Sequence, residues 1–234
     1  YLNRLYKDIN LFNLMDHWLL TTHGAALFPM AVFLWNWKTR KDTASIFMFI
    51  KFLYAVTYSL LYHSHHSLPE KDVFTSDYDY SNWSLLDGYA ASSSIFTTVL
   101  YTLRVREPQF YITSFAVENI VLVVYLWEKL DQALILTWYL SVCSAIVCVL
   151  KWRTIWRYLI RFKILSFFTI CCGITAVVMY CIAVRQFYNE IYIKYHSLWH
   201  CFVFSTAGFG ALLRYNLDEQ LYPIINRRDA LDSL

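Results

Sequence analysis

The sequence has little charge, glycine or proline. Only 16% of its 234 residues are Asp, Glu, Lys or Arg, and it contains five glycines and four prolines. Ordinary soluble domains carry about 25% charged residues, so this chain cannot cover a typical soluble surface. The scarcity of glycine and proline also excludes collagen, a linker array and a disordered tail.

The sequence also lacks paired cysteines and a basic stripe. Its six cysteines form no Cys-x-x-Cys pair, and all of them lie in apolar stretches. This pattern predicts small apolar core residues and excludes a disulfide framework and a thiolate zinc cage. The net charge is only +3, with the basic residues separated by long apolar runs. Such a distribution is untypical of a nucleic-acid-binding surface, so we expect no nucleic-acid partner.

Apolar residues are abundant instead. The hydrophobic fraction is 58%, the aromatic fraction 19% and the mean hydropathy +0.38. A membrane-spanning helix needs about 20 largely apolar residues. The sequence predicts seven such segments, approximately residues 18–37, 44–62, 83–103, 110–127, 133–150, 164–184 and 195–213. We therefore expect an all-α fold in which residues 1–234 form a single seven-transmembrane helix bundle.

The basic residues predict how this bundle is oriented. Of the 20 Lys and Arg residues, 13 follow the odd-numbered segments, 6 lie in the N-terminal lead or follow the even-numbered segments, and Lys51 lies inside the second segment. The positive-inside rule then places the N-terminus outside and the C-terminus in the cytoplasm. Residues 151–163 (KWRTIWRYLIRFK) carry five of these bases, no acid and interleaved aromatics. This stretch is either an interfacial segment that touches anionic lipid or only a topology anchor.

Several polar residues inside the predicted spans fall at the same depth. Ser59 and His63 are four residues apart, hence on one helix face, and so are His196 and His200. With alternating span directions, both pairs and Asp87 lie at the outer ends of their spans. Three imidazoles with an open position are typical of catalytic zinc sites. The sequence therefore predicts a zinc ion held by three histidines near the outer leaflet, beside a carboxylate and a hydroxyl.

Six further ionisable residues lie in or beside the predicted spans: His17, His23, Lys51, His65, His66 and Glu118. We interpret the first two histidines as interfacial residues with hydrogen-bonded rings. The adjacent pair of histidines after His63 is either an alternative set of ligands or, as we favour, polar loop residues. The lysine and the glutamate either snorkel to the membrane surface or pair within the bundle.

Three stretches carry a resemblance to a known superfamily: residues 58–64 (YSLLYHS), 86–108 (LDGYAASSSIFTTVLYTLRVREP) and 195–213 (YHSLWHCFVFSTAGFGALL). The chain resembles the seven-helix CREST superfamily of membrane hydrolases, which includes alkaline ceramidases and adiponectin receptors. Within this superfamily, the sequence that flanks these motifs is more similar to the branch that contains myomaker and the lipid-anchor-cleaving transmembrane-protein-8 group. The resemblance covers the seven-span core.

The resemblance implies roles for five residues. His63, His196 and His200 would bind Zn²⁺, and Asp87 would shuttle a proton as a catalytic carboxylate. Ser59, the second catalytic residue, would hydrogen-bond the activated water or a developing oxyanion. Myomaker members do not uniformly retain the serine and the aspartate, whereas this chain keeps both, which leaves hydrolysis open.

The resemblance and the compact length lead us to expect a plasma-membrane protein that promotes cell–cell (myoblast) membrane fusion. The alternative is a zinc-dependent amide or ester hydrolase of a membrane lipid, in the plasma membrane, Golgi or ER. A seven-span receptor with a structural zinc ion ranks third. The expected partners are membrane lipids, with a second copy of the chain and a fusion partner protein as further candidates.

Overall fold

The computed structural model describes residues 18–66, 77–127, 132–185 and 190–232, and every regular element in these ranges is a helix. Residues 18–22 are helical and lead into the short 3₁₀ helix η1. The elements are η1 (His23–Ala26), α2 (Leu27–Arg40), α3 (Thr43–His66), α4 (Asp77–Thr102), α5 (Gln109–Trp127), α6 (Gln132–Leu150), α7 (Trp152–Arg161), α8 (Lys163–Ala183) and α9 (Glu190–Asp232). The expected all-α class is confirmed.

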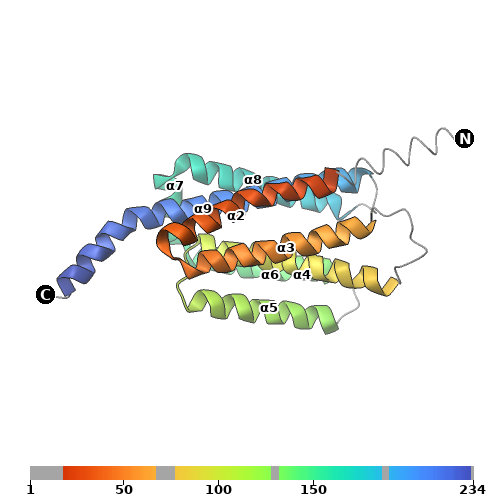
Figure 1. Cartoon of the computed structure of the whole chain (residues 1–234), viewed down its shortest axis with the longest axis horizontal. Helices are drawn as coiled ribbons and strands as arrows, with labels where there is room; N and C mark the ends of the chain where they lie inside the picture. The colour runs from red at the N-terminus through yellow and green to blue at the C-terminus, as the bar shows by residue number, and fades with distance from the viewer. Residues whose placement is uncertain (1–17, 67–76, 128–131, 186–189, 233–234) are drawn as a thin grey trace, which may run out of the picture.

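Most of the helices run along one common axis (Figure 1). Helices α2, α8 and α9 form one side of the bundle, α3, α4 and α6 lie in the middle, and α5 covers the opposite side. Helix α9 packs along α8, α2 and α4, and its C-terminal part extends past the bundle. Because α9 contacts so many elements, its residues are placed to complete a site with side chains from several helices.

Each of the seven predicted segments lies on a helix, although the bounds differ. Helix α4 begins at Asp77, before the expected start, and α9 continues from Glu190 to Asp232. Among the described residues, three helices are long and apolar enough to cross a membrane, or four if the bent pair of α6 and α7 counts as one span. The chain is therefore a membrane protein by these criteria. Seven spans, and the orientation of the termini, stay predictions.

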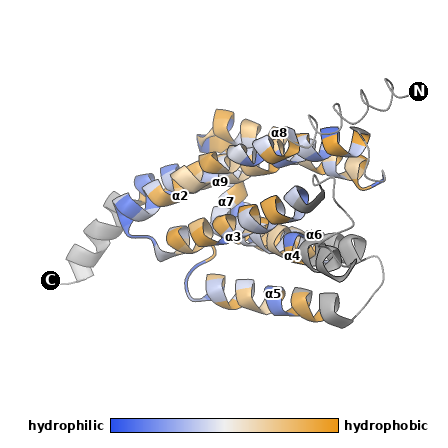
Figure 2. Cartoon of the chain, turned by 45° about the vertical axis from the view of Figure 1, so that its right-hand side comes forward, coloured by the Kyte–Doolittle hydropathy of each residue, from blue (hydrophilic) through white to orange (hydrophobic). Residues whose placement is uncertain are grey.

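Helix α8 shows the surface expected of a lipid-facing helix. Its side chains Ile164, Phe167 and Val177 are 76%, 62% and 63% exposed. Hydrophobic residues, drawn in orange, also recur along α2, α3 and α5 (Figure 2). Monomeric soluble proteins rarely expose contiguous apolar surface on this scale, so hydrocarbon rather than water is the expected surroundings.

Aromatic side chains form the centre of the core. Phe33, Phe96, Tyr101 and Phe110 are at most 1% exposed and belong to one cluster that joins α2, α4 and α5. The ring of Phe33 meets that of Tyr101 edge to face, with centroids 5.2 Å apart. Offset and edge-to-face pairs of this kind stabilise a core beyond their buried area. This packing holds the helices on which the polar site is built.

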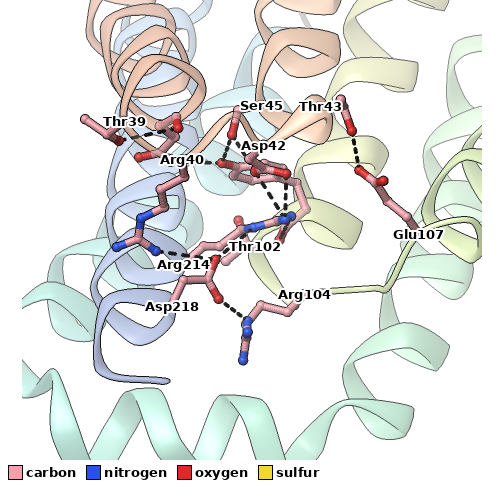
Figure 3. Close-up of polar contacts among 12 residues, drawn as sticks. Thr39, Arg40, Asp42, Thr43, Ser45, Thr102, Arg104, Glu107, Arg214 and Asp218 are labelled. Carbon is pink, nitrogen blue, oxygen red and sulfur yellow. Dashed lines mark hydrogen bonds and ion pairs between the residues drawn. The ribbon is translucent and has the colours of Figure 1, made fainter. Parts of the chain in front are cut away.

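An ionic network closes the end of the bundle at the α2–α3 turn (Figure 3). Arg214 of α9 contacts Asp42 at 3.2 Å and Asp218 at 3.5 Å. Arg104, which follows α4, reaches Asp218 at 2.5 Å. Arg214 also donates a hydrogen bond to the carbonyl oxygen of Tyr101 at 3.1 Å. The network links α9 to two turns and fixes the position of α9 along its axis.

Lys51 and Glu118 pair inside the bundle, which decides between the two alternatives considered from the sequence. Lys51 of α3 forms an ion pair with Glu118 of α5, and their side chains are 13% and 15% exposed. Lys51 also donates to Ser93 at 2.5 Å, and Ser114 donates to Glu118 at 2.6 Å. The charges are thus satisfied within the bundle and do not extend to its surface.

The six cysteines are all free thiols, as expected. Five are partly buried, while Cys181 on α8 is exposed. The expectation that all of them are core residues is therefore wrong for Cys181, because α8 turns much of its surface outward.

Candidate metal centre

Four histidine side chains meet at the end of the bundle opposite to the ionic network. His63 lies near the C-terminal end of α3, His196 and His200 lie one turn apart on α9, and His23 begins η1. The exposed fractions of all four are between 1% and 8%. Imidazoles buried together in this way need hydrogen-bond partners or a metal ion.

The rings are close to one another. The centroid of His63 lies 5.1 Å from that of His196 and 5.7 Å from that of His200. The two rings of α9 are 4.8 Å apart, and His23 lies 4.1 Å from His200. The structure thus brings together the three histidines predicted from the spacing and adds a fourth. Their roles as zinc ligands stay predictions.

One subset fits a metal ion best. Ring nitrogens of His23, His63 and His200 all lie within 4.8 Å of one another. Zn–N bonds of about 2.0–2.1 Å in a tetrahedral site place ligand nitrogens roughly 3.4 Å apart, so small ring movements complete the site. Within the described part of the chain, neither nitrogen of His200 has a hydrogen-bond partner. These buried ring nitrogens suit Zn²⁺ as ligands. Among the described residues, the ring nitrogens of His196 also have no hydrogen-bond partner, so His196 is the alternative third ligand.

The sequence interpretation of His23 as an interfacial residue is wrong. Its ring is 3% exposed and lies against His200, although the expectation of a hydrogen-bonded ring holds. Its Nδ1 donates to the carbonyl oxygen of Leu19 at 3.0 Å, which leaves the lone pair of a neutral ring on Nε2. Such a backbone contact fixes the tautomer and orientation of a ligand histidine.

Ser59 and Asp87 lie beside the histidines. The Ser59 hydroxyl is 2.9 Å from Nε2 of His23, and it also hydrogen-bonds the side chain of Asp87. Ser59 is 4% exposed, and Asp87 is partly buried. The predicted carboxylate and hydroxyl are therefore in place to act together on a molecule bound at the histidines.

A largely apolar cavity of about 110 Å³ extends from these groups between α3, α4 and α9. Ser59, Asp87 and His200 line its polar part, and Ser94, Thr98 and Thr206 line it elsewhere, with their hydroxyls donating to backbone carbonyl oxygens. The rest of the wall is mostly apolar and includes Phe52, Ile95, Val99, Trp199, Val203 and Phe204. From residue 87 to residue 99, α4 rises roughly 18 Å, the length of a medium acyl chain. The arrangement suits an amphiphile with its polar group at the histidines.

Three other sequence expectations concern neighbouring histidines. His17 lies outside the described residues. His65 and His66 were expected in a loop, but the backbone of α3 remains helical through His66. Their side chains lie outside the described set, so the interpretation of them as alternative ligands stays open. His23 is the site residue that sequence reasoning missed, and the signal available was its position inside an apolar segment.

No family model, curated protein or solved structure matches the chain. The resemblance to the seven-helix hydrolases therefore stays an expectation, and we infer the function from the geometry of the site.

Proposed function

We propose that the chain is a metal-dependent hydrolase that cleaves an amide or ester bond in a membrane lipid. The observation that supports this proposal is the apolar cavity, whose polar part is lined by Ser59, Asp87 and His200. A buried histidine cluster alone would suit a structural metal ion equally well. A cavity that brings an apolar chain to a carboxylate, a hydroxyl and imidazoles is what a lipid hydrolase requires.

Each residue has a part in this proposal. His23, His63 and His200, or His196 in place of His23, would hold Zn²⁺. A zinc ion supplies Lewis acidity that polarises a carbonyl and activates water at neutral pH. Asp87 takes the proton of the attacking water and passes it to the leaving amine or alcohol. With Nε2 of His23 held by the metal ion, the single proton of the Ser59 hydroxyl would be donated to Asp87, which keeps the carboxylate oriented.

The reaction consumes one water molecule. Its hydroxyl group joins the acyl carbon, the C–N or C–O bond breaks, and the proton ends on the leaving group. The products are a fatty acid and an amine or alcohol, and the apolar cavity holds the acyl chain during the reaction. We place the protein in the plasma membrane, with Golgi or ER as the alternative location.

The test compares Asp87→Asn with wild type on fluorescent long-chain ceramide and phospholipid substrates in detergent micelles. The substitution keeps shape but removes the base, so the rate should fall by roughly 10²–10⁴-fold, the usual contribution of general acid–base catalysis. Ser166→Ala is the matched control, because it changes a buried serine of α8 away from the cavity. Zinc-loaded, folded wild-type protein that cleaves neither substrate class would refute the proposal, and so would full activity of Asp87→Asn.

Promotion of cell–cell fusion is the second proposal. It is supported by the resemblance to the myomaker branch in residues 58–64, 86–108 and 195–213. Expression in two fusion-incompetent cell populations, followed by counting of multinucleate cells, tests it. If a structural zinc ion serves fusion, Asp87→Asn should still fuse cells, whereas His63→Ala and His200→Ala should not. Surface expression of each variant is checked in parallel.

A further inference from the structure

The short helix α7 departs from the direction of the bundle. It is bent by 73° from residues 139–150 of α6. It lies at the end of the bundle where α2 turns into α3 (Figure 1). A helix turned by this angle from the end of α6 runs across the end of the bundle instead of continuing along its axis.

One face of α7 is anchored to the bundle. The Tyr158 side chain is 3% exposed, and its hydroxyl donates to the carbonyl oxygen of Thr102 at 2.6 Å. Tyr158 packs in a small core with Leu103, Leu213 and Leu217. Burial of the phenol in this core raises its pKa, so it stays protonated and keeps donating. These contacts fix which sides of α7 face outward.

A second face is apolar and exposed. Trp152, Trp156 and Ile160 are 58%, 57% and 52% exposed. They are spaced four residues apart, which places them in one row along the helix. Tryptophan is enriched where membrane headgroups meet hydrocarbon, because its ring is apolar and its indole N–H is polar.

A third face carries arginines beside this apolar row. Arg153, Arg157 and Arg161 each follow a member of the row, so they form a parallel row about 100° further round the helix. All three are exposed. Within the described part of the chain, none of them forms an ion pair: Arg153 lies 5.8 Å from the ring of Trp152, and Arg161 donates to Gln220 at 3.2 Å. By contrast, the arginines of the nearby ionic network are paired with aspartates (Figure 3).

We propose that α7 is a binding surface for the headgroups of anionic phospholipids in the leaflet at this end of the bundle. The apolar row lies at the boundary of hydrocarbon and headgroups, and the arginines contact lipid phosphates and carboxylates. The positive charges attract these anionic oxygens, and unpaired basic rows beside apolar ones are typical of interfacial helices. The positive-inside rule, which predicts that residues 151–163 face the cytoplasm, agrees with this proposal, because the cytoplasmic leaflet is the one that contains anionic lipids.

The experiment measures lipid selectivity in proteoliposomes of phosphatidylcholine with about one tenth phosphatidylserine, using spin-labelled versions of both lipids. Wild-type protein should immobilise phosphatidylserine roughly three- to tenfold more strongly than phosphatidylcholine, and 1 M salt should reduce this ratio. The triple change Arg153→Gln, Arg157→Gln and Arg161→Gln should lower the ratio to about one. Arg185→Gln, an exposed arginine just beyond the other end of α8, should leave it unchanged.

A second triple variant with lysine at the same three positions keeps the charge and should retain most of the selectivity, even if the glutamine variant unfolds. Equal immobilisation of both lipids by wild type would overturn the proposal. So would selectivity that persists in the folded glutamine variant or disappears in the folded lysine variant. Hydrolysis at the histidine site is measured separately, so failure of this proposal leaves the proposed function unaffected.

Discussion

Removal of one partner from the buried ion pair of Lys51 and Glu118 should strongly destabilise the protein. Lys51→Met removes the cation and leaves the Glu118 carboxylate in the bundle with hydroxyl partners alone. Ser114 donates to this carboxylate at 2.6 Å and Thr97 at 3.5 Å, which does not replace a cation. Breaking one side of a buried pair costs about 3–5 kcal/mol, because an uncompensated charge remains.

For a chain of this size, each kcal/mol shifts the melting temperature by roughly 2–4 °C, so Lys51→Met should melt roughly 6–20 °C below wild type. The double change Lys51→Met and Glu118→Gln removes both charges and keeps a side chain that can accept from Ser114. It should recover most of the loss, because replacing a buried pair by neutral groups is often close to neutral. Lys194→Met, which removes an exposed lysine of α9, is the control and should melt near wild type.

Thermal unfolding of the purified variants in one detergent, followed by thiol-reactive dye or circular dichroism, gives the four melting temperatures. A melting temperature of Lys51→Met within about 2 °C of wild type would refute the reasoning, since a difference that small corresponds to less than about 1 kcal/mol. A double variant no more stable than Lys51→Met would show that the loss does not come from the unpaired carboxylate.

Three further predictions concern the metal, the topology and the helix packing. Elemental analysis of the purified protein should find about one zinc ion per chain, and His200→Ala should lose most of it. Comparison of the zinc content of His23→Ala with that of His196→Ala identifies the third ligand. Wild-type protein that is equally well folded without metal would contradict the site. Epitope tags stained with and without permeabilisation should show the N-terminus outside and the C-terminus inside, and a C-terminal tag visible on intact cells would reverse this. Gly210→Ala should lower the melting temperature, because the added Cβ would lie 2.6 Å from Oγ1 of Thr102. Gly173→Ala is the control, since its Cβ would make an ordinary 3.6 Å contact with Thr206 and should be tolerated. Equal melting temperatures of the two variants would argue against close packing of α9 on α4.

The polar site was partly predictable because helical periodicity is local. Residues four apart share a face in any α-helix, so the pairs Ser59/His63 and His196/His200 follow from spacing alone. The alternation of span directions then predicted that these pairs and Asp87 meet. The structure places Ser59 and Asp87 in hydrogen-bond contact and the histidine rings about 5 Å apart.

By itself the sequence determined that the chain is an all-α membrane protein and that His196 and His200 share one helix face, since composition and period are properties of single segments. The tertiary structure alone decided that His23 joins the cluster, that Lys51 pairs with Glu118, and that an apolar cavity meets Asp87. These contacts connect residues that are 36 positions apart, as for His23 and Ser59, or 67 apart, as for the ion pair. No periodic pattern encodes which of several neighbouring helices will pack together, because that choice depends on the shape and polarity of all of their faces at once.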